Sequence, residues 1–239
     1  MKFELGKKRY NDYPTFFRTL FEERVQKLSI DGGFTCPNRD GSKGVGGCSF
    51  CNNESFNPDY CRAVRGITEQ IDEGIRFFAR KYKGQRYLAY FQAYSNTYAP
   101  LDVLKLRYEE ALAHPMISGL VIGTRPDVVS EEVLDYLEEL ARRYYVCVEY
   151  GVESVNDTVL RQVNRGHDFA VAEQAIRATA GRGITIGAHL IFGLPGESRE
   201  SMLEGAIRLC ELPIQVLKLH QLQIVKGTRL AEQYLENPA

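Results

Sequence analysis

YLAYFQAYSNTYAPLDVLKLRYEEALAHPMISGLVIGTRPD, residues 87–127, contains the pattern that decides the fold. The apolar run 87–91 predicts a buried strand. Pro100 stands where a helix over 101–113 begins, because proline costs little in the first turn of a helix. A second apolar run, 118–123, predicts the next strand. Strand, helix and strand in this order form a right-handed βαβ unit, so the two strands are expected to be parallel.

The same alternation of strand and helix continues along the chain. Apolar runs predict six strands, at 25–33, 87–91, 118–123, 145–151, 184–193 and 214–224. Helical patterns follow them, at 67–82, 101–113, 131–144, 169–180, 198–212 and 229–237. Ser130 and Asp168 stand where their side-chain oxygens can cap the third and fourth of these helices. The alternation predicts an α/β protein with a parallel sheet.

Polar residues follow every predicted strand and not only one of them. They fall at 36–51, 92–96, 124–127, 151–154, 193–197 and 226–228. An open doubly wound sheet binds its ligand in one crevice, whereas an α/β barrel builds its site from the loops after many strands. We therefore predict a partial (β/α)6 barrel, similar to an incomplete TIM barrel, with the cysteine-containing loop after the first strand.

Length and composition are those of a single domain of 239 residues. Residues 25–239 are expected to form the barrel, and residues 1–24, which are mildly basic and aromatic, to cover its core. No apolar run is long enough to span a bilayer and the start lacks a secretion signal, which predicts a cytoplasmic protein with no membrane partner. The net charge of −1 is not that of a chain basic throughout, so any nucleic-acid contact is expected to be local.

The loop CPNRDGSKGVGGCSFC, residues 36–51, carries three of the six cysteines. Cys48 and Cys51 have the two-residue gap that lets both sulfurs reach one centre, and Cys36 returns to it across a glycine-rich turn. In a reducing cytosol such clustering indicates a metal site or catalysis rather than disulfides. Three thiolates on a four-iron cluster leave one iron free to bind a small molecule.

Cys61 offers an alternative set of ligands. With the three loop cysteines it forms the spacing C-x11-C-x2-C-x9-C, which suits a four-thiolate zinc site. Structural zinc usually uses two close pairs of cysteines, so we favour the three-thiolate cluster and interpret Cys61 as an incidental thiol. Cys147, on a predicted strand, and Cys210, on a predicted helix, are expected to be small core residues.

Further motifs complete a pattern that resembles the radical S-adenosylmethionine (SAM) enzymes. GVESVNDTVLRQVNRGHD (151–168) and HLIFGLPGES (189–198) are similar to the fourth-strand and fifth-strand motifs of Elongator-type and related members, and GTRPD (123–127) recurs in the Elongator-like group. The resemblance is closest to the YhcC/MnmL-like group, which is related to the radical domain of the Elongator catalytic subunit. It implies a [4Fe–4S] cluster whose free iron binds SAM, which is cleaved to methionine and a 5′-deoxyadenosyl radical that takes hydrogen from a substrate.

The resemblance also implies roles for individual residues. Cys36, Cys48 and Cys51 would bind the cluster, and Phe50 would lie beside the adenine of SAM. Glu153 or Ser154 would bond the ribose, Arg165 would approach the carboxylate, and the turn of Gly193, Leu194 and Pro195 would flank the adenine. Arg125 and His189 are further candidates for contact with SAM. The Gly-Gly-Glu motif that commonly receives the methionine amino group is replaced by residues 92–96, QAYSN, where Gln92 and Asn96 are the candidates by position and chemistry.

The implied substrate is transfer RNA, modified on a wobble uridine side chain, with a reducing electron donor such as flavodoxin or ferredoxin. Two other interpretations stay open: the same radical chemistry on a small metabolite or peptide, and a zinc-stabilised barrel that binds nucleic acid without redox chemistry. Relatives usually continue beyond the sixth strand, so the last helix is expected to be incomplete and some substrate-reading parts to be missing. The sequence does not indicate an oligomeric state.

Replacing Cys61 with Ala distinguishes the two sets of metal ligands. We expect the anaerobically purified Cys61→Ala protein to keep its iron content and the broad absorption near ~400 nm of an iron–sulfur cluster, because Cys61 is not a ligand. Cys48→Ala is the matched variant that should lose both. Loss of metal from Cys61→Ala, measured by elemental analysis, would instead support the four-thiolate site.

Overall fold

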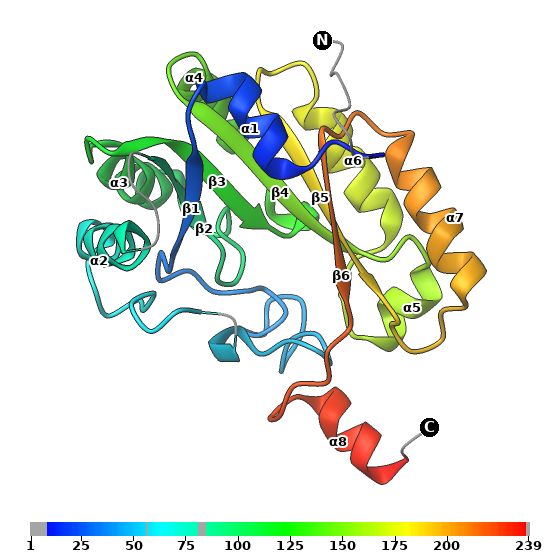
Figure 1. The fold of residues 1–239 in the computed structure, drawn as a ribbon. Coiled ribbons are helices and arrows are strands. Elements are labelled where there is room, and N and C mark those ends of the chain that lie inside the picture. The colour runs from blue at the N-terminus through cyan, green and yellow to red at the C-terminus, as the bar shows by residue number, and fades with distance from the viewer. Residues whose placement is uncertain (1–8, 56, 81–84, 238–239) are drawn as a thin grey trace.

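Six parallel strands form one sheet in the computed structural model, which describes residues 9–55, 57–80 and 85–237 (Figure 1). Their order across the sheet is their order in the chain. They are β1 (Val25–Ile30), β2 (Arg86–Phe91), β3 (Ile117–Thr124), β4 (Tyr145–Glu153), β5 (Thr185–Phe192) and β6 (Val216–Gln221). Because every pair is parallel, all the carboxyl ends lie at one edge of the sheet, and the loops that follow the strands meet there.

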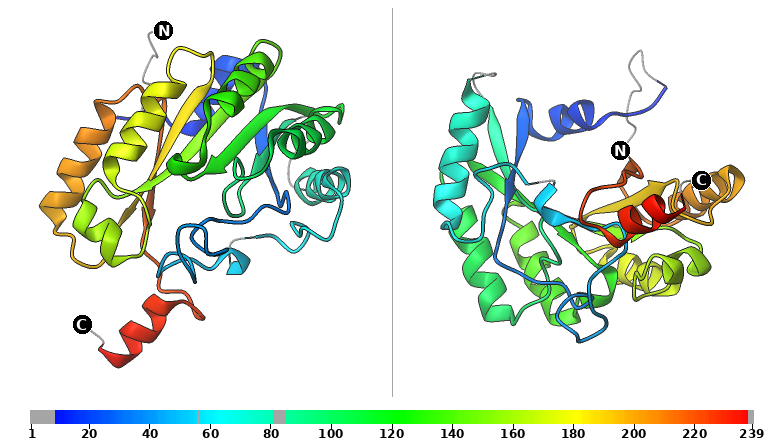
Figure 2. Two further views of the ribbon diagram at one scale, coloured as in Figure 1. Left: turned by 180° about the vertical axis from the view of Figure 1, so that it is seen from behind. Right: turned by 90° about the horizontal axis from the view of Figure 1, so that it is seen from below.

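Helices between the strands cover the convex face of the sheet (Figure 2). In chain order they are α2 (Ile67–Ala79), α3 (Leu101–Leu112), α4 (Glu131–Ala141), α5 (Asp157–Gln162), α6 (Phe169–Thr179) and α7 (Arg199–Cys210). Alternate strand residues such as Ile30, Phe91 and Ile122 are fully buried in the main core under these helices. The helix after β6, α8 (Arg229–Glu236), lies instead at the end of the molecule where the strands finish (Figure 1).

Most helix ends follow the sequence signals. Ser130 and Asp168 cap α4 and α6 as predicted, because each side-chain oxygen accepts a hydrogen bond from a backbone N–H three residues on, at 3.3 and 3.1 Å. Two short 3₁₀ turns, η1 (Asn53–Ser55) and η2 (Pro126–Val128), lie in the loops after β1 and β3. Residues 81–82 of the predicted helix 67–82, residues 1–8 of the predicted covering segment and residues 238–239 lie outside the described part of the chain.

Two details of the sequence interpretation were wrong. The short helix α5 was not predicted; it begins after Asn156, whose side chain accepts from the backbone N–H groups of Thr158 and Val159. Cys210 was expected in the core, but it is exposed at the end of α7, whereas Cys147 is fully buried on β4. The surroundings of Cys210 depend on tertiary packing, whereas α5 has a local cap and is only six residues long.

The sheet curls into an open half-barrel. β1 and β6 are the two edges of the sheet in the described residues, so the barrel is not closed between them. Seen from the end where the strands finish, the curled sheet carries its helices outside, while the loop after β1 and α8 lie across its mouth (Figure 2). The architecture confirms the predicted partial (β/α)6 barrel of parallel strands. Within the described residues, no helix has both the length and the apolar character needed to cross a membrane.

The helix α1 (Tyr13–Phe21) packs against the concave face of the sheet, near the amino-terminal ends of the strands (Figure 1). Phe17 is buried there with Leu88, Val121 and Cys147, which belong to β2, β3 and β4. The ring of Tyr145 meets Phe17 edge-on, with centroids 5.5 Å apart. This second apolar cluster fills one end of the half-barrel, and the interior stays open at the other.

The packing of α1 can be tested by truncating Phe17. Phe17→Ala removes a buried aromatic ring from the inner cluster, so we expect the free energy of unfolding to fall by about 3 kcal/mol or more. The control is Phe77→Ala, the same change at a ring on α2 that is 60% exposed, which should cost much less. Equal losses in urea unfolding of the two variants would contradict the inner-face packing.

Candidate cofactor site at the barrel mouth

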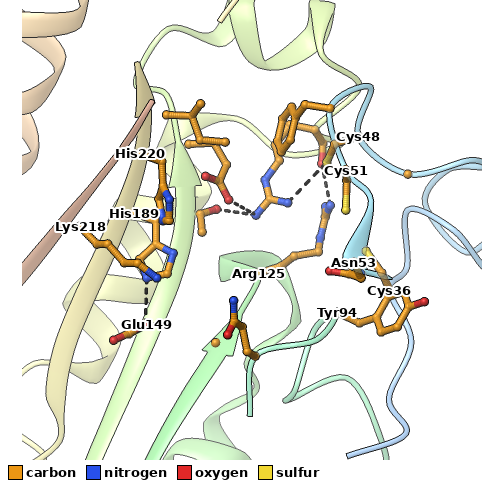
Figure 3. Close-up of a pocket in the computed structure, with 18 of the residues that line it drawn as sticks. Cys36, Cys48, Cys51, Asn53, Tyr94, Arg125, Glu149, His189, Lys218 and His220 are labelled. Carbon is orange, nitrogen blue, oxygen red and sulfur yellow. Dashed lines mark hydrogen bonds and ion pairs between the residues drawn. The ribbon is translucent and has the colours of Figure 1, made fainter. Parts of the chain in front are cut away.

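The carboxyl ends of the strands surround a cavity of about 550 Å³ (Figure 3). Figure 3 shows Cys36, Cys48 and Cys51 on one side and Glu149 and His189 on the other. We call the first side the cluster wall, and the second, formed by Glu149, His189, Lys218 and His220, the β6 wall. A cavity of this volume, lined by both polar and apolar groups, is of the size that holds a small-molecule cofactor.

The cluster loop, residues 36–51, is ordered by its own backbone hydrogen bonds. Arg39 N–H donates to the Cys36 carbonyl at 2.8 Å, and Cys51 N–H donates to the Cys48 carbonyl at 3.0 Å. Gly47 has a positive φ of 81°, and a side chain there would meet the guanidinium of Arg39. Glycine is therefore required where the chain turns back from Cys36 toward Cys48.

Two arginines stand beside the thiols. An Arg165 N–H donates to the Cys48 sulfur at 3.6 Å, and an Arg39 N–H donates to the Cys51 carbonyl at 2.7 Å. Burial, and then the neighbouring Cys48, raise the pKa of the Cys51 thiol, although the Arg39 charge opposes them. The buried Nε of Arg165 has no hydrogen-bond partner among the described residues. Three thiols, a nearby positive charge and an unpaired donor fit a thiolate-bound, negatively charged cluster with a ligand beside it.

The structure does not bring Cys61 to the other cysteines. Cys61 lines a separate cavity with Asp31 and Asp59, and burial raises the pKa of its thiol to about 12. Among residues 9–55, 57–80 and 85–237, no group of three or more His, Cys, Asp or Glu side chains is close enough to hold a single metal ion. Cys61 therefore does not lie with Cys36, Cys48 and Cys51, which line the cavity at the barrel mouth.

Arg125 lines the cavity, but most of its guanidinium is already engaged. It forms two hydrogen bonds with the Asp127 carboxylate, at 2.9 and 2.8 Å, and a third with the Arg165 carbonyl at 2.7 Å. Lys43 of the cluster loop also reaches Asp127, at 2.7 Å. Burial alone would raise the pKa of Asp127, yet Arg125 and Lys43 lower it to about 2. The three residues clamp the loop after β3 to the cluster loop.

Two residues that line the cavity hold strained backbone conformations. Tyr94 has φ 63° and Glu153 has φ 70°, values that residues other than glycine rarely adopt. At Glu153 the pairing of β4 with β5 shifts register, and its carboxylate lies 3.7 Å from the Arg165 guanidinium. Gly151 allows this close approach, because a Cβ there would lie 2.8 Å from Arg165. Strain of this kind is commonly retained where side chains must face a ligand.

The predicted residues divide into two groups. Those that line the cavity are Cys36, Cys48, Phe50, Cys51, Gln92, Arg125, Glu153, Arg165 and His189. Those that do not are Asn96, Ser154, Gly193, Leu194 and Pro195. For the residues of both groups, contact with SAM remains a prediction.

The residues outside the lining have other partners. The Asn96 amide donates to the carbonyls of Phe91 and Gly123, so it holds the loop after β2 in place. The Ser154 hydroxyl donates to Glu197 and accepts from the Asn156 N–H. Leu194 is buried in a small cluster against which Phe50 packs. Leu194 can therefore act on the cavity through Phe50.

The β6 wall contains residues that the sequence interpretation missed or left without a role. Glu149 is 1% exposed on β4; its carboxylate forms an ion pair with Lys27 of β1 and accepts from His189 of β5 at 2.9 Å. Burial would raise the pKa of Glu149, but the His189 hydrogen bond and the Lys27 charge hold it well below its usual range. The sequence did contain a signal for Glu149: it is a charged residue in the middle of the apolar strand YVCVEYG. A charged side chain is rarely buried without a partner, so its position in such a strand indicates a specific role inside the barrel.

The half-barrel with a cysteine loop at its mouth defines a class: α/β-barrel enzymes that bind a metal-containing cofactor at the carboxyl ends of their strands. Comparison with known proteins gives the family. The family model described as the Radical SAM superfamily matches residues 36–207. Protein YhcC of Escherichia coli (strain K12) is 43% identical over 213 residues, which are 89% of this chain and 68% of that protein. The chain therefore belongs to the Radical SAM superfamily, a family of enzymes.

More distant relatives share parts of the chain. The tRNA uridine(34) acetyltransferase of Methanocaldococcus infernus is 27% identical over 131 residues, 54% of this chain and 24% of that protein. A solved structure, the archaeal Methanocaldococcus infernus Elp3 with an N-terminal deletion, matches with a TM-score of 0.63 at 18% identity. That match covers 90% of this chain and 49% of the other, so the chain spans about half the length of the solved relative. The family implies a [4Fe–4S] cluster and SAM as cofactors.

The Glu149 network should make stability depend on pH. Glu149→Gln removes a buried charge and leaves Lys27 uncompensated, so we expect the cluster-free protein to lose about 3 kcal/mol of unfolding free energy at neutral pH. The folded pKa of Glu149 lies below the ordinary 4.5, so its stabilising contribution is complete above that pH and is lost as the pH falls toward the folded value.

Urea unfolding of wild type and Glu149→Gln at several pH values between neutral and acid checks this expectation. The control is Glu173→Gln, which breaks an exposed pair with Arg177 on α6 and should change stability by about 0.5 kcal/mol or less. A difference between wild type and Glu149→Gln that stays constant as the pH falls would contradict the assigned charge.

Proposed function

We propose that the protein holds a [4Fe–4S] cluster through Cys36, Cys48 and Cys51 and uses it to cleave SAM reductively. The observation that carries the proposal is the meeting of these three cysteines and two arginines at one cavity, in a chain of the Radical SAM superfamily. When bound, the cluster and SAM supply a 5′-deoxyadenosyl radical that abstracts hydrogen, with methionine as the other product. A reduced flavodoxin or ferredoxin would provide the electron.

The side chains of the cavity bind and orient the cofactor. Arg165, buried beside Cys48 with an unpaired Nε, suits the SAM carboxylate, since a guanidinium N–H donates well to a carboxylate oxygen. Glu153, held in a strained backbone conformation, or the neighbouring Ser154 suits the ribose hydroxyls. Phe50, which packs with Leu194, offers an apolar face to the adenine, and the turn 193–195 lies beyond it.

Gln92 is a further candidate for the methionine end of SAM. Its side-chain oxygen accepts from the Ser29 hydroxyl at 3.3 Å, and Gln92 lines the cavity. His189 lines the same cavity with its Nε2 turned to Glu149. Arg125, clamped by Asp127, acts as a positioning residue for the loop that carries Arg165.

Transfer RNA is the proposed substrate, with the side chain of a wobble uridine as the site of modification. The support is the partial sequence similarity to a tRNA uridine(34) acetyltransferase and the structural similarity to Elp3. Tyr94 and Arg39, at the cavity rim, could hold a base by stacking, and the Arg39 guanidinium already lies 6.0 Å from the Tyr94 ring. The similarity to the acetyltransferase covers about half of this chain.

The SAM reaction is tested with anaerobically reconstituted protein reduced by dithionite. We expect wild type to release methionine and 5′-deoxyadenosine in equal amounts, and Cys48→Ala to lose at least about a hundredfold in rate because the cluster loses a ligand. Cys210→Ala, which changes an exposed cysteine on α7, is the matched control and should keep wild-type activity. Failure of wild type to cleave SAM would overturn the proposal.

The RNA assignment has a separate test. Nucleosides of transfer RNA from cells with and without the gene are compared by mass spectrometry, and a modified wobble uridine should disappear or be replaced by its precursor without the gene. An unchanged nucleoside profile, together with normal SAM cleavage in vitro, would redirect the proposal to a small metabolite or peptide.

A further inference from the structure

The β6 wall faces the cluster wall across the cavity (Figure 3). His189 of β5 and Lys218 of β6 are register partners, and His220 lies two residues further along β6, with its ring centroid 5.3 Å from that of His189. None of the cluster ligands belongs to this wall. Its polar side chains therefore face whatever lies in the cavity opposite the cluster.

Most of the charge near the β6 wall is already compensated. Glu149 pairs with Lys27 and accepts from His189, so one carboxylate serves two neighbours. The Lys27 ammonium also lies over the rings of Tyr13 and Tyr90, at 4.4 and 4.7 Å from their centroids. These contacts link β1, β2, β4 and β5 around the Glu149 carboxylate.

Lys218 is the exception. Its ammonium lies 5.7 Å from the centroid of Tyr90, and within the described part of the chain no carboxylate lies within 4.0 Å of it. The ionisable groups around it are Lys27 from β1, Tyr90 from β2, Glu149 and Glu153 from β4, His189 from β5 and His220 from β6. Partial burial lowers the pKa of Lys218, although the charges of Glu149 and Glu153 oppose this.

His220 complements this cation. Burial, followed by the charge of Lys218, lowers the pKa of His220 to about 4, so its ring is neutral at physiological pH. A neutral imidazole carries one N–H that can donate to an oxygen. Lys218 and His220 thus present an ammonium and a ring N–H from alternate positions of one strand, and alternate positions of a strand share a face.

We propose that Lys218, assisted by His220, binds an anionic oxygen group of the substrate, a carboxylate or a phosphate, on the side of the cavity opposite the cluster. This inference deepens the proposed function and rests on it, because it names the chemistry of a substrate held between the β6 wall and SAM. The anion supplies the close negative partner that Lys218 lacks within the chain. The Lys27–Glu149–His189 network positions the wall.

Protection of Lys218 from acylation tests the site without relying on turnover. The reconstituted holoenzyme with SAM, under anaerobic conditions, is treated briefly with an amine-acylating reagent, and the labelling of each lysine is read by mass spectrometry. Sodium acetate and inorganic phosphate are the probes, with sodium chloride at matched ionic strength as the blank. Lys226, exposed just beyond β6, is the internal control.

We expect an anion present at ten times its dissociation constant to slow Lys218 labelling by about tenfold, from mass action, and to leave Lys226 unchanged. Protection by acetate alone identifies a carboxylate, protection by phosphate alone identifies a phosphate, and protection by both supports a general oxyanion site. Equal labelling with every probe, or equal protection of Lys218 and Lys226, overturns the inference.

The outcome is separable from that of the proposed function. Lys218 protection in a protein that does not cleave SAM would contradict the radical chemistry and leave the anion site standing. Normal SAM cleavage without protection would contradict only the anion site. Lys218→Arg, which keeps the positive charge, should retain affinity for the protecting probe, acetate or phosphate, better than Lys218→Met, whereas equal losses would indicate a packing role and contradict the inference.

Discussion

The cluster loop is fixed by hydrogen bonds to a segment more than a hundred residues away, and the geometry of the mouth depends on this attachment. The Asn38 amide donates to the Asn164 carbonyl, the Asn164 amide donates to the Gly47 carbonyl at 2.8 Å, and Ser49 N–H donates to the Val163 carbonyl at 2.9 Å. Residues 36–51 contain no regular helix or strand, so their backbone groups need such partners. The turn after α5 therefore sets where the cysteines stand.

The same turn contains Arg165, so the turn places a positive charge beside the cluster loop in addition to its hydrogen bonds with that loop. One guanidinium bonds the Gly151 carbonyl of β4, contacts the Cys48 sulfur and stands near the Glu153 carboxylate. A cluster held by three thiolates carries negative charge in a partly buried site, and a nearby cation lowers the cost of that burial. The short helix α5 matters because it connects β4 to the turn that contains Arg165 and so places this side chain beside the cluster loop.

The open edge between β1 and β6 would leave a half-barrel exposed on its inner face if nothing filled it. α1 occupies the amino-terminal end through Phe17, and the Lys27–Glu149–His189 contacts form the next layer toward the mouth. A polar layer is tolerated there because each of its charges has a partner, whereas an unpaired buried charge would be costly. The cavity thus has a polar floor in which Glu149 contacts both Lys27 and His189, whereas Lys218 has no carboxylate within 4.0 Å in the described part of the chain.

The fold could be predicted from sequence because its signals are local. Apolar runs, helix caps such as Ser130 and polar groups after each strand all follow from short stretches, and parallel connection places those groups on one edge. Which side chains then meet is a long-range matter. Glu149 was passed over inside an apolar run, and its partners Lys27 and His189 lie on strands far from it in sequence.

The loop after β2 shows that a predicted site residue can also hold the backbone. The Asn96 amide nitrogen donates to the carbonyls of Phe91 and Gly123, and the buried Tyr108 hydroxyl donates to the Asn96 carbonyl. The side-chain oxygen of Asn96 has no hydrogen-bond partner among the described residues, and its contact with the cofactor stays a prediction. The hydrogen bonds of Asn96 join the end of β2 to β3 and α3, and Tyr94, which has a strained backbone conformation, lies in the same loop and lines the cavity. Within the segment QAYSN, Asn96 holds the backbone, while Gln92 and Tyr94 line the cavity.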